Sequence, residues 1–171
     1  MTASGFALFD TAIGRCGIAW GERGVAGVQL PEAGDRETRA RMLHRFPAAG
    51  EGPLPIDVQC AVDWIAALLR GETSDLSSVA LDMSEVPAFH RRVYEVARTI
   101  PPGMTLSYGD IAARIGAPGA ARAVGQALGR NPFPIVVPCH RVSPPAARSA
   151  AFPGRGVSRQ SGACWRSRAR R

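Results

Sequence analysis

The segment Pro138-Cys-His-Arg141 places a thiol directly before an imidazole and a guanidinium. A cysteine attacks as its thiolate, and a nearby imidazole or positive charge lowers the pKa of the thiol. His140 can take the proton of Cys139 directly or through a water molecule. Three prolines between Asn131 and Cys139 stiffen the backbone that leads to the cysteine. The segment therefore predicts a positioned nucleophile, and a buried structural cysteine beside an unrelated histidine is the alternative for such a dipeptide.

The other cysteines and histidines give no sign of a metal centre or of disulfides. Cys16, Cys60 and Cys164 are widely separated, and the sequence contains no Cys-x-x-Cys pair. His44, His90 and Cys60 lie at no recognised zinc-ligand spacing. We therefore expect no metal and no cofactor, and a protein that works in the thiol-reducing cytoplasm.

Three predicted helices precede the reactive segment. The first begins at Ser84 and carries a buried stripe at helical spacing. The second is capped by Ser107, with Asp110 three residues on as a capping-box variant. A glycine-containing break at 116–119 separates it from a third helix over 120–128. Two short helices joined by a glycine turn are typical of a helix-turn-helix, although any helical hairpin gives a similar pattern.

The third of these helices consists almost entirely of small residues around Arg122. A helix that reads bases in the major groove usually presents Asn, Gln, Arg or Lys. Small residues instead allow a close approach to a surface, and one projecting guanidinium suits a narrow minor groove and insertion into the base stack. Packing of this helix against another helix through Ala and Gly is the structural alternative.

The first half of the sequence predicts an α/β domain of about 80 residues. Short apolar runs separated by turn residues predict a meander of strands over 6–9, 17–20 and 24–30. Helices are expected over 35–46 and from a cap at Asp57 to Gly71. Further strands are expected over 78–81 and, within the reactive segment, over 135–137.

Charge is distributed unevenly along the 171 residues. Residues 1–85 hold seven arginines and 12 acidic residues, a net −5, whereas 86–142 hold seven arginines and two acidic residues, a net +5. Residues 143–171 add seven arginines and no acidic residue. This arrangement favours a scaffold joined to a part that binds a polyanion. No apolar run approaches the length of about 18 residues that a membrane span requires.

The reactive segment, preceded by Asn131-Pro-x-Pro-Ile, resembles the active-site signature of the methylated-DNA–protein-cysteine methyltransferases. The similarity is nearly continuous over 87–142 and includes Leu106-Ser-Tyr-Gly-Asp-Ile-Ala and Ala120-Ala-Arg-Ala-Val-Gly. It implies a ribonuclease-H-like α/β domain followed by a helix-turn-helix (winged-helix-like) DNA-binding domain. We place these domains at 1–84 and 85–142, with an atypical basic tail at 143–171.

The resemblance also implies a role for each site residue. Cys139 is the alkyl acceptor, His140 its water-mediated base, and Asn131 the brace of the turn that carries the cysteine. Tyr108 helps to rotate the nucleotide, and Arg122 fills the gap that the flipped base leaves in the stack. The remaining expected DNA contacts are Ala121, Ala123 and Gly125 on the small-residue helix, and Arg141.

The implied reaction is a single irreversible transfer of a methyl or alkyl group to Cys139. The implied substrate is alkylated guanine, with thymine as a further base, in double-stranded DNA. The implied protein is a monomer in the bacterial cytoplasm, associated with the nucleoid and not with a membrane.

After Val142 the motifs of the family stop. The family continues with a glycine-rich loop that walls the base pocket and a helix whose Glu orients the active-site His, but residues 143–171 contain no Leu, Ile or acidic residue. Loss of one nucleotide after Val142 explains this, because the other reading frame can restore both the loop and a Leu-Leu-Ala-Leu-Glu ending. A genuine basic tail that contacts phosphates is the alternative.

Two other functions compete with repair. A non-catalytic protein that binds alkylated DNA, inactive because of the altered tail, would share the scaffold, but such relatives replace the acceptor cysteine and Cys139 is present. A helix-turn-helix regulator without lesion chemistry would need base-reading side chains, and the helix around Arg122 is nearly devoid of them.

Overall fold

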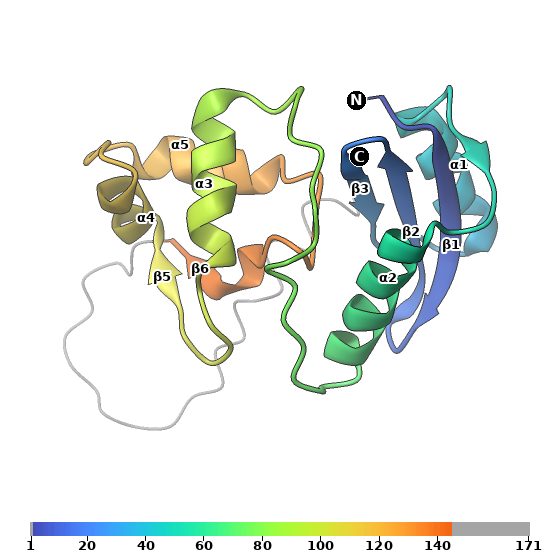
Figure 1. Ribbon diagram of the computed structural model, residues 1–171. Helices are drawn as coiled ribbons and strands as arrows, with labels where there is room; N and C mark the ends of the chain where they lie inside the picture. The colour runs from blue at the N-terminus through green and yellow to red at the C-terminus, as the bar shows by residue number, and fades with distance from the viewer. Residues whose placement is uncertain (1, 145–171) are drawn as a thin grey trace. The chain divides into compact units, whose positions relative to one another are not determined.

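The computed structural model describes residues 2–144, which form two compact units (Figure 1). The first contains the described chain up to Val86 together with Pro132–Val136, and the second contains Pro87–Asn131 and the described residues 137–144. Residues 132–136, which we expect in the second domain from the sequence, lie in the first unit. Hydrogen bonds explain the difference, because the carbonyl of Pro132 accepts from the Val28 N–H at 2.9 Å and from Arg45 at 3.3 Å.

The first unit is built on a mixed sheet of strand order β3-β2-β1-β4. The expected meander is confirmed as three antiparallel strands, and β4 pairs parallel to β1. The strands are β1 (Gly5–Thr11), β2 (Gly14–Gly21), β3 (Gly24–Gln29) and β4 (Gly50–Glu51). Gly24 has a φ of +115°, and a Cβ there would lie 2.5 Å from the Ala80 carbonyl oxygen, so the turn requires glycine.

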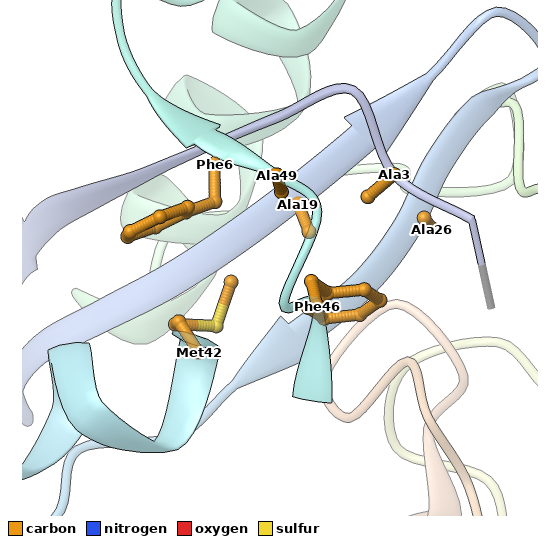
Figure 2. Close-up of a cluster of buried hydrophobic side chains, with 7 residues drawn as sticks. All are labelled: Ala3, Phe6, Ala19, Ala26, Met42, Phe46 and Ala49. Carbon is orange, nitrogen blue, oxygen red and sulfur yellow. The ribbon is translucent and has the colours of Figure 1, made fainter. Parts of the chain in front are cut away.

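Two helices, α1 (Asp35–Arg45) and α2 (Ile56–Leu69), pack against this sheet. Figure 1 shows α1 behind the sheet and α2 in front of it. Five consecutive residues of β2 are buried, which is the pattern of a strand covered on both faces. Figure 2 shows the core under α1, which consists of Ala3, Phe6, Ala19, Ala26, Met42, Phe46 and Ala49.

Two expectations for the first unit are wrong in detail. Helix α2 begins at Ile56 with Pro55 at the N-cap, so Asp57 lies in its first turn and does not cap it. The strand expected over 78–81 is reduced to one parallel bridge between Leu81 and Val25. A turn that is closed by the Val79 N–H on the Leu76 carbonyl keeps the chain from pairing before that bridge.

The second unit packs three helices against one another: α3 (Ala88–Arg98), α4 (Tyr108–Arg114) and α5 (Ala121–Gly129). The helix expected from Ser84 begins only at Ala88, and Pro87 is the N-cap. The capping box at the start of α4 is confirmed, because the Ser107 hydroxyl accepts from the Asp110 N–H while the Asp110 carboxylate accepts from the Ser107 N–H. The buried Tyr94 hydroxyl of α3 donates to the Ala127 carbonyl of α5 at 2.8 Å.

A two-residue parallel ladder joins β5 (Leu106–Ser107) to β6 (Val142–Ser143). The ladder brings the segment after the reactive cysteine to the start of α4. The strand expected over 135–137 is wrong, since residues 135 and 136 form a turn and Ile135 has a φ of +76°. Of the basic tail that we place at 143–171, the structure describes only Ser143 and Pro144.

Candidate active site

Cys139 is the first residue of the 3-10 turn η1 (Cys139–Arg141) and is half-buried. Pro138 before it has φ −78° and ψ +68°, the geometry of an inverse γ-turn. The turn is closed by the Cys139 N–H, which donates to the Val137 carbonyl at 2.8 Å. The Arg141 N–H then donates to the Pro138 carbonyl at 2.9 Å. Two consecutive tight turns therefore fix the backbone on both sides of the thiol.

Asn131 is buried, with 2% of its surface exposed, and it holds the first of these turns. Its Nδ2 donates to the Val137 carbonyl at 3.2 Å, the same oxygen that receives the Cys139 N–H. Its own N–H donates to the Leu128 carbonyl at the end of α5. The side chain thus ties the turn before the cysteine to the C-terminal end of α5.

His140 follows the cysteine in η1; the residue is partly exposed, and the surrounding chain removes part of the water around its ring. Desolvation of the ring, followed by the positive charge of Arg141, lowers the pKa of His140 below its ordinary value of 6.5. An imidazole with a lowered pKa is neutral at neutral pH, which is the form that can accept a proton. The residue after the thiol is therefore in the protonation state that a base requires.

Arg141 is half-buried, and its guanidinium is already engaged within the unit. Its Nη1 donates to the Ile100 carbonyl at 2.7 Å, which ties η1 to the chain just after α3. Burial lowers the pKa of Arg141, and the guanidinium remains charged because the pKa of an arginine lies far above neutral pH. One end of this side chain therefore stabilises the reactive turn.

Tyr108 is the first residue of α4 and follows β5 directly. The capping box fixes the backbone on either side of it, and the ladder to β6 places this point of the chain beside the end of η1. Its ring is half-buried and packs over Gly125 of α5. The structure thus pairs the strand that precedes Tyr108 with the strand that follows the reactive segment.

Helix α5 buries Val124, Ala127 and Leu128 and leaves its other side accessible. Arg122 lies on that side and is exposed, while Ala121, Ala123 and Gly125 are half-buried. The helix therefore presents one long cationic side chain among short ones, as the sequence predicts.

Two structural features near the reactive segment could not be predicted from the sequence. Arg45, at the end of α1, donates to the carbonyls of Val28 and Pro132 and to the Gln29 amide oxygen. Nothing distinguishes it in the sequence from the other arginines of that helix. Ile135 adopts a φ of +76°, which is rare for a β-branched residue and which no sequence pattern signals.

The fold and site define an α/β protein with a cysteine held in a tight turn of its helical unit. Residues 88–163 match the family model of the 6-O-methylguanine DNA methyltransferase DNA-binding domain. The matched range runs 21 residues past Val142, into the basic tail.

Curated relatives include the methylated-DNA–protein-cysteine methyltransferase of Mycobacterium tuberculosis, 47% identical over 100 residues that span 58% of this chain and 59% of the relative. The bifunctional transcriptional activator/DNA repair enzyme Ada of Escherichia coli is 37% identical over 137 residues, 80% of this chain and 38% of Ada. The matched part of the chain thus spans less than two thirds of these relatives.

Solved structures are similar over more of their length. The crystal structure of Mycobacterium tuberculosis O6-methylguanine methyltransferase is 33% identical, with a TM-score of 0.68, and the similarity covers 96% of this chain and 88% of that one. The structure of Mycobacterium tuberculosis OGT in complex with DNA is 34% identical, with a TM-score of 0.64, covering 84% and 79%. The chain belongs to the methylated-DNA–protein-cysteine methyltransferase family.

Proposed function

We propose that this protein repairs DNA by moving an alkyl group irreversibly from the O6 atom of guanine to the sulfur of Cys139. The carrying observation is the shared Val137 carbonyl, which accepts both the Asn131 side chain and the Cys139 N–H. A backbone fixed at this point holds the sulfur in one direction, which a displacement at carbon requires.

The reaction is a displacement at the alkyl carbon. The Cys139 proton passes to the neutral His140 ring, directly or through water, and leaves a thiolate. The sulfur electron pair forms a carbon–sulfur bond while the carbon–O6 bond breaks and its electrons stay with guanine. Guanine then takes up a proton, and the product thioether on Cys139 cannot be displaced by ordinary thiol exchange.

DNA engagement rests on α4 and α5, which we assign as a helix-turn-helix. Arg122 projects from the accessible side of α5, where Ala121, Ala123 and Gly125 are short enough to permit a close approach to a minor groove. We assign it to the space of the flipped base, with Tyr108 at the start of α4 as the residue that rotates the nucleotide. Residues 86–142 carry a net +5, which favours contact with phosphates.

The remaining assignments concern the whole protein. We assign the first unit as a ribonuclease-H-like scaffold and the protein as a monomer that acts on the bacterial nucleoid in the cytoplasm. No helix within residues 2–144 is long and apolar enough to cross a membrane. Alkylated thymine is the further base that we include in the substrate class.

Labelled transfer tests the proposal. A duplex that contains guanine with a radiolabelled O6-methyl group is incubated with the protein, and we expect the label to move to the protein. Cys139→Ser should bind the duplex and take no label, because a serine hydroxyl is far harder to deprotonate. Cys60→Ser, at an exposed position on α2, is the matched control and should accept label normally. Binding of the duplex without any transfer by the unaltered protein would contradict the proposal.

A further inference from the structure

Gly125 of α5 lies directly under the ring of Tyr108. A Cβ atom at position 125 would lie 2.9 Å from Tyr108 Cε2, 3.2 Å from Cδ2 and 3.5 Å from Cζ. These three ring atoms are the nearest neighbours that such a Cβ would meet. The absence of a side chain at Gly125 therefore creates the place in which the ring of Tyr108 rests.

The backbone of Tyr108 has little freedom to respond to a change at position 125. The capping box between Ser107 and Asp110 encloses it, and β5 before it pairs with β6. The ring itself is the end of a side chain that turns about two bonds, so it is the part that moves when space is lost. An added methyl group would displace the ring while leaving α4 and α5 folded.

We propose that Gly125 is a positioning residue that sets the direction of the Tyr108 ring. The main role of its small size is to make room for this ring, and an approach of the helix to DNA is secondary. The inference rests on the proposed function, in which Tyr108 rotates the target nucleotide. A ring turned away from α5 cannot meet the nucleotide in the required geometry. Nucleotide flipping therefore becomes less efficient, whereas the alkyl-transfer step at Cys139 is unchanged.

A double-mutant cycle tests this inference. Gly125→Ala should slow alkyl transfer from duplex DNA about ten- to a hundredfold, the range expected for a small misplacement, and should slow transfer from free O6-methylguanine much less. Gly129→Ala is the matched control on the same helix, since a Cβ there meets nothing within 4 Å, and it should react like the unaltered protein. In a Tyr108→Ala background, Gly125→Ala should add almost no further loss.

A second readout is independent of activity. Tyr94 and Tyr108 are the two tyrosines of the sequence, and Tyr94 is 1% exposed. Nitration with tetranitromethane, followed by peptide mass mapping, should modify Tyr108 faster in Gly125→Ala than in Gly129→Ala, with Tyr94 slow in both.

The outcomes separate the inference from the proposed function. If Gly125→Ala costs as much without the Tyr108 ring as with it, or leaves Tyr108 nitration unchanged, the inference is overturned and Gly125 acts by itself. If the unaltered protein transfers no methyl group but Gly125→Ala still exposes Tyr108, the proposed function fails while the packing contact stands.

Discussion

Replacing Asn131 by Ala removes the side chain that anchors the turn before Cys139. The Val137 carbonyl loses the bond from Nδ2 at 3.2 Å but keeps the bond from the Cys139 N–H at 2.8 Å, so it is not left wholly unsatisfied. The loss therefore lies at the lower end of the cost of a buried hydrogen bond, about 1–2 kcal/mol. For a chain of this length such a loss lowers Tm by about 2–8 °C.

The effect on Cys139 should exceed the effect on stability. A turn that has lost one of two bonds samples other sulfur positions, so transfer should slow about ten- to a hundredfold. Thermal unfolding and the transfer rate are measured on Asn131→Ala and on Gln59→Ala, which removes a surface amide from α2 in the first unit and should change neither appreciably. Equal rates for the two variants would refute the role of Asn131 as a brace.

Asn131→Asp tests the same hydrogen bond through the pH dependence of stability. The carboxylate cannot donate to the Val137 carbonyl, and burial raises the pKa of an unpaired carboxyl group. Its protonated form can donate, so this variant should recover stability relative to Asn131→Ala as the pH falls from about 8 to about 5. A difference between the two variants that does not vary with pH would contradict the donor role.

Three further changes probe other parts of the account. Arg122→Ala should slow transfer from duplex DNA about ten- to a hundredfold and hardly affect free O6-methylguanine, which needs no flipping; equal losses would assign Arg122 to the fold. The lowered pKa of His140 predicts that transfer slows on acidification with a midpoint below the ordinary imidazole value of 6.5, whereas a midpoint above that value would exclude His140 as the neutral base. Arg45→Met keeps the stem but loses the bonds to Val28, Gln29 and Pro132, and should cost about 1–3 kcal/mol of unfolding free energy by denaturant titration; an unchanged midpoint would count against this anchor.

The α/β class and most helices follow from local signals. Short apolar runs separated by glycine turns predict β1 to β3, and Ser107 with Asp110 predicts the start of α4, because both patterns depend on neighbours in the chain. The reactive segment is predicted in the same way, since the thiol, the imidazole and the guanidinium are consecutive. Proline stiffness is local too, although it does not reveal which turn the chain adopts.

What the sequence does not predict depends on contacts between distant residues. Ile135-Val-Val reads as a strand, yet the bonds of Pro132 to Val28 and Arg45 draw the segment into the first unit and leave a turn at Ile135. The contact of Gly125 with the Tyr108 ring spans 17 positions and depends on how α4 meets α5. Arg141, which is expected at DNA, places one nitrogen on the Ile100 carbonyl.

The central claim is that Cys139 accepts one alkyl group and never releases it. The protein is incubated with excess DNA that contains O6-methylguanine, and intact mass and peptide mapping follow the modification over time. We expect a plateau at no more than one methyl group per chain, located on Cys139 and not on Cys16, Cys60 or Cys164. Repeated turnover, or a modification that persists in Cys139→Ser, would contradict it.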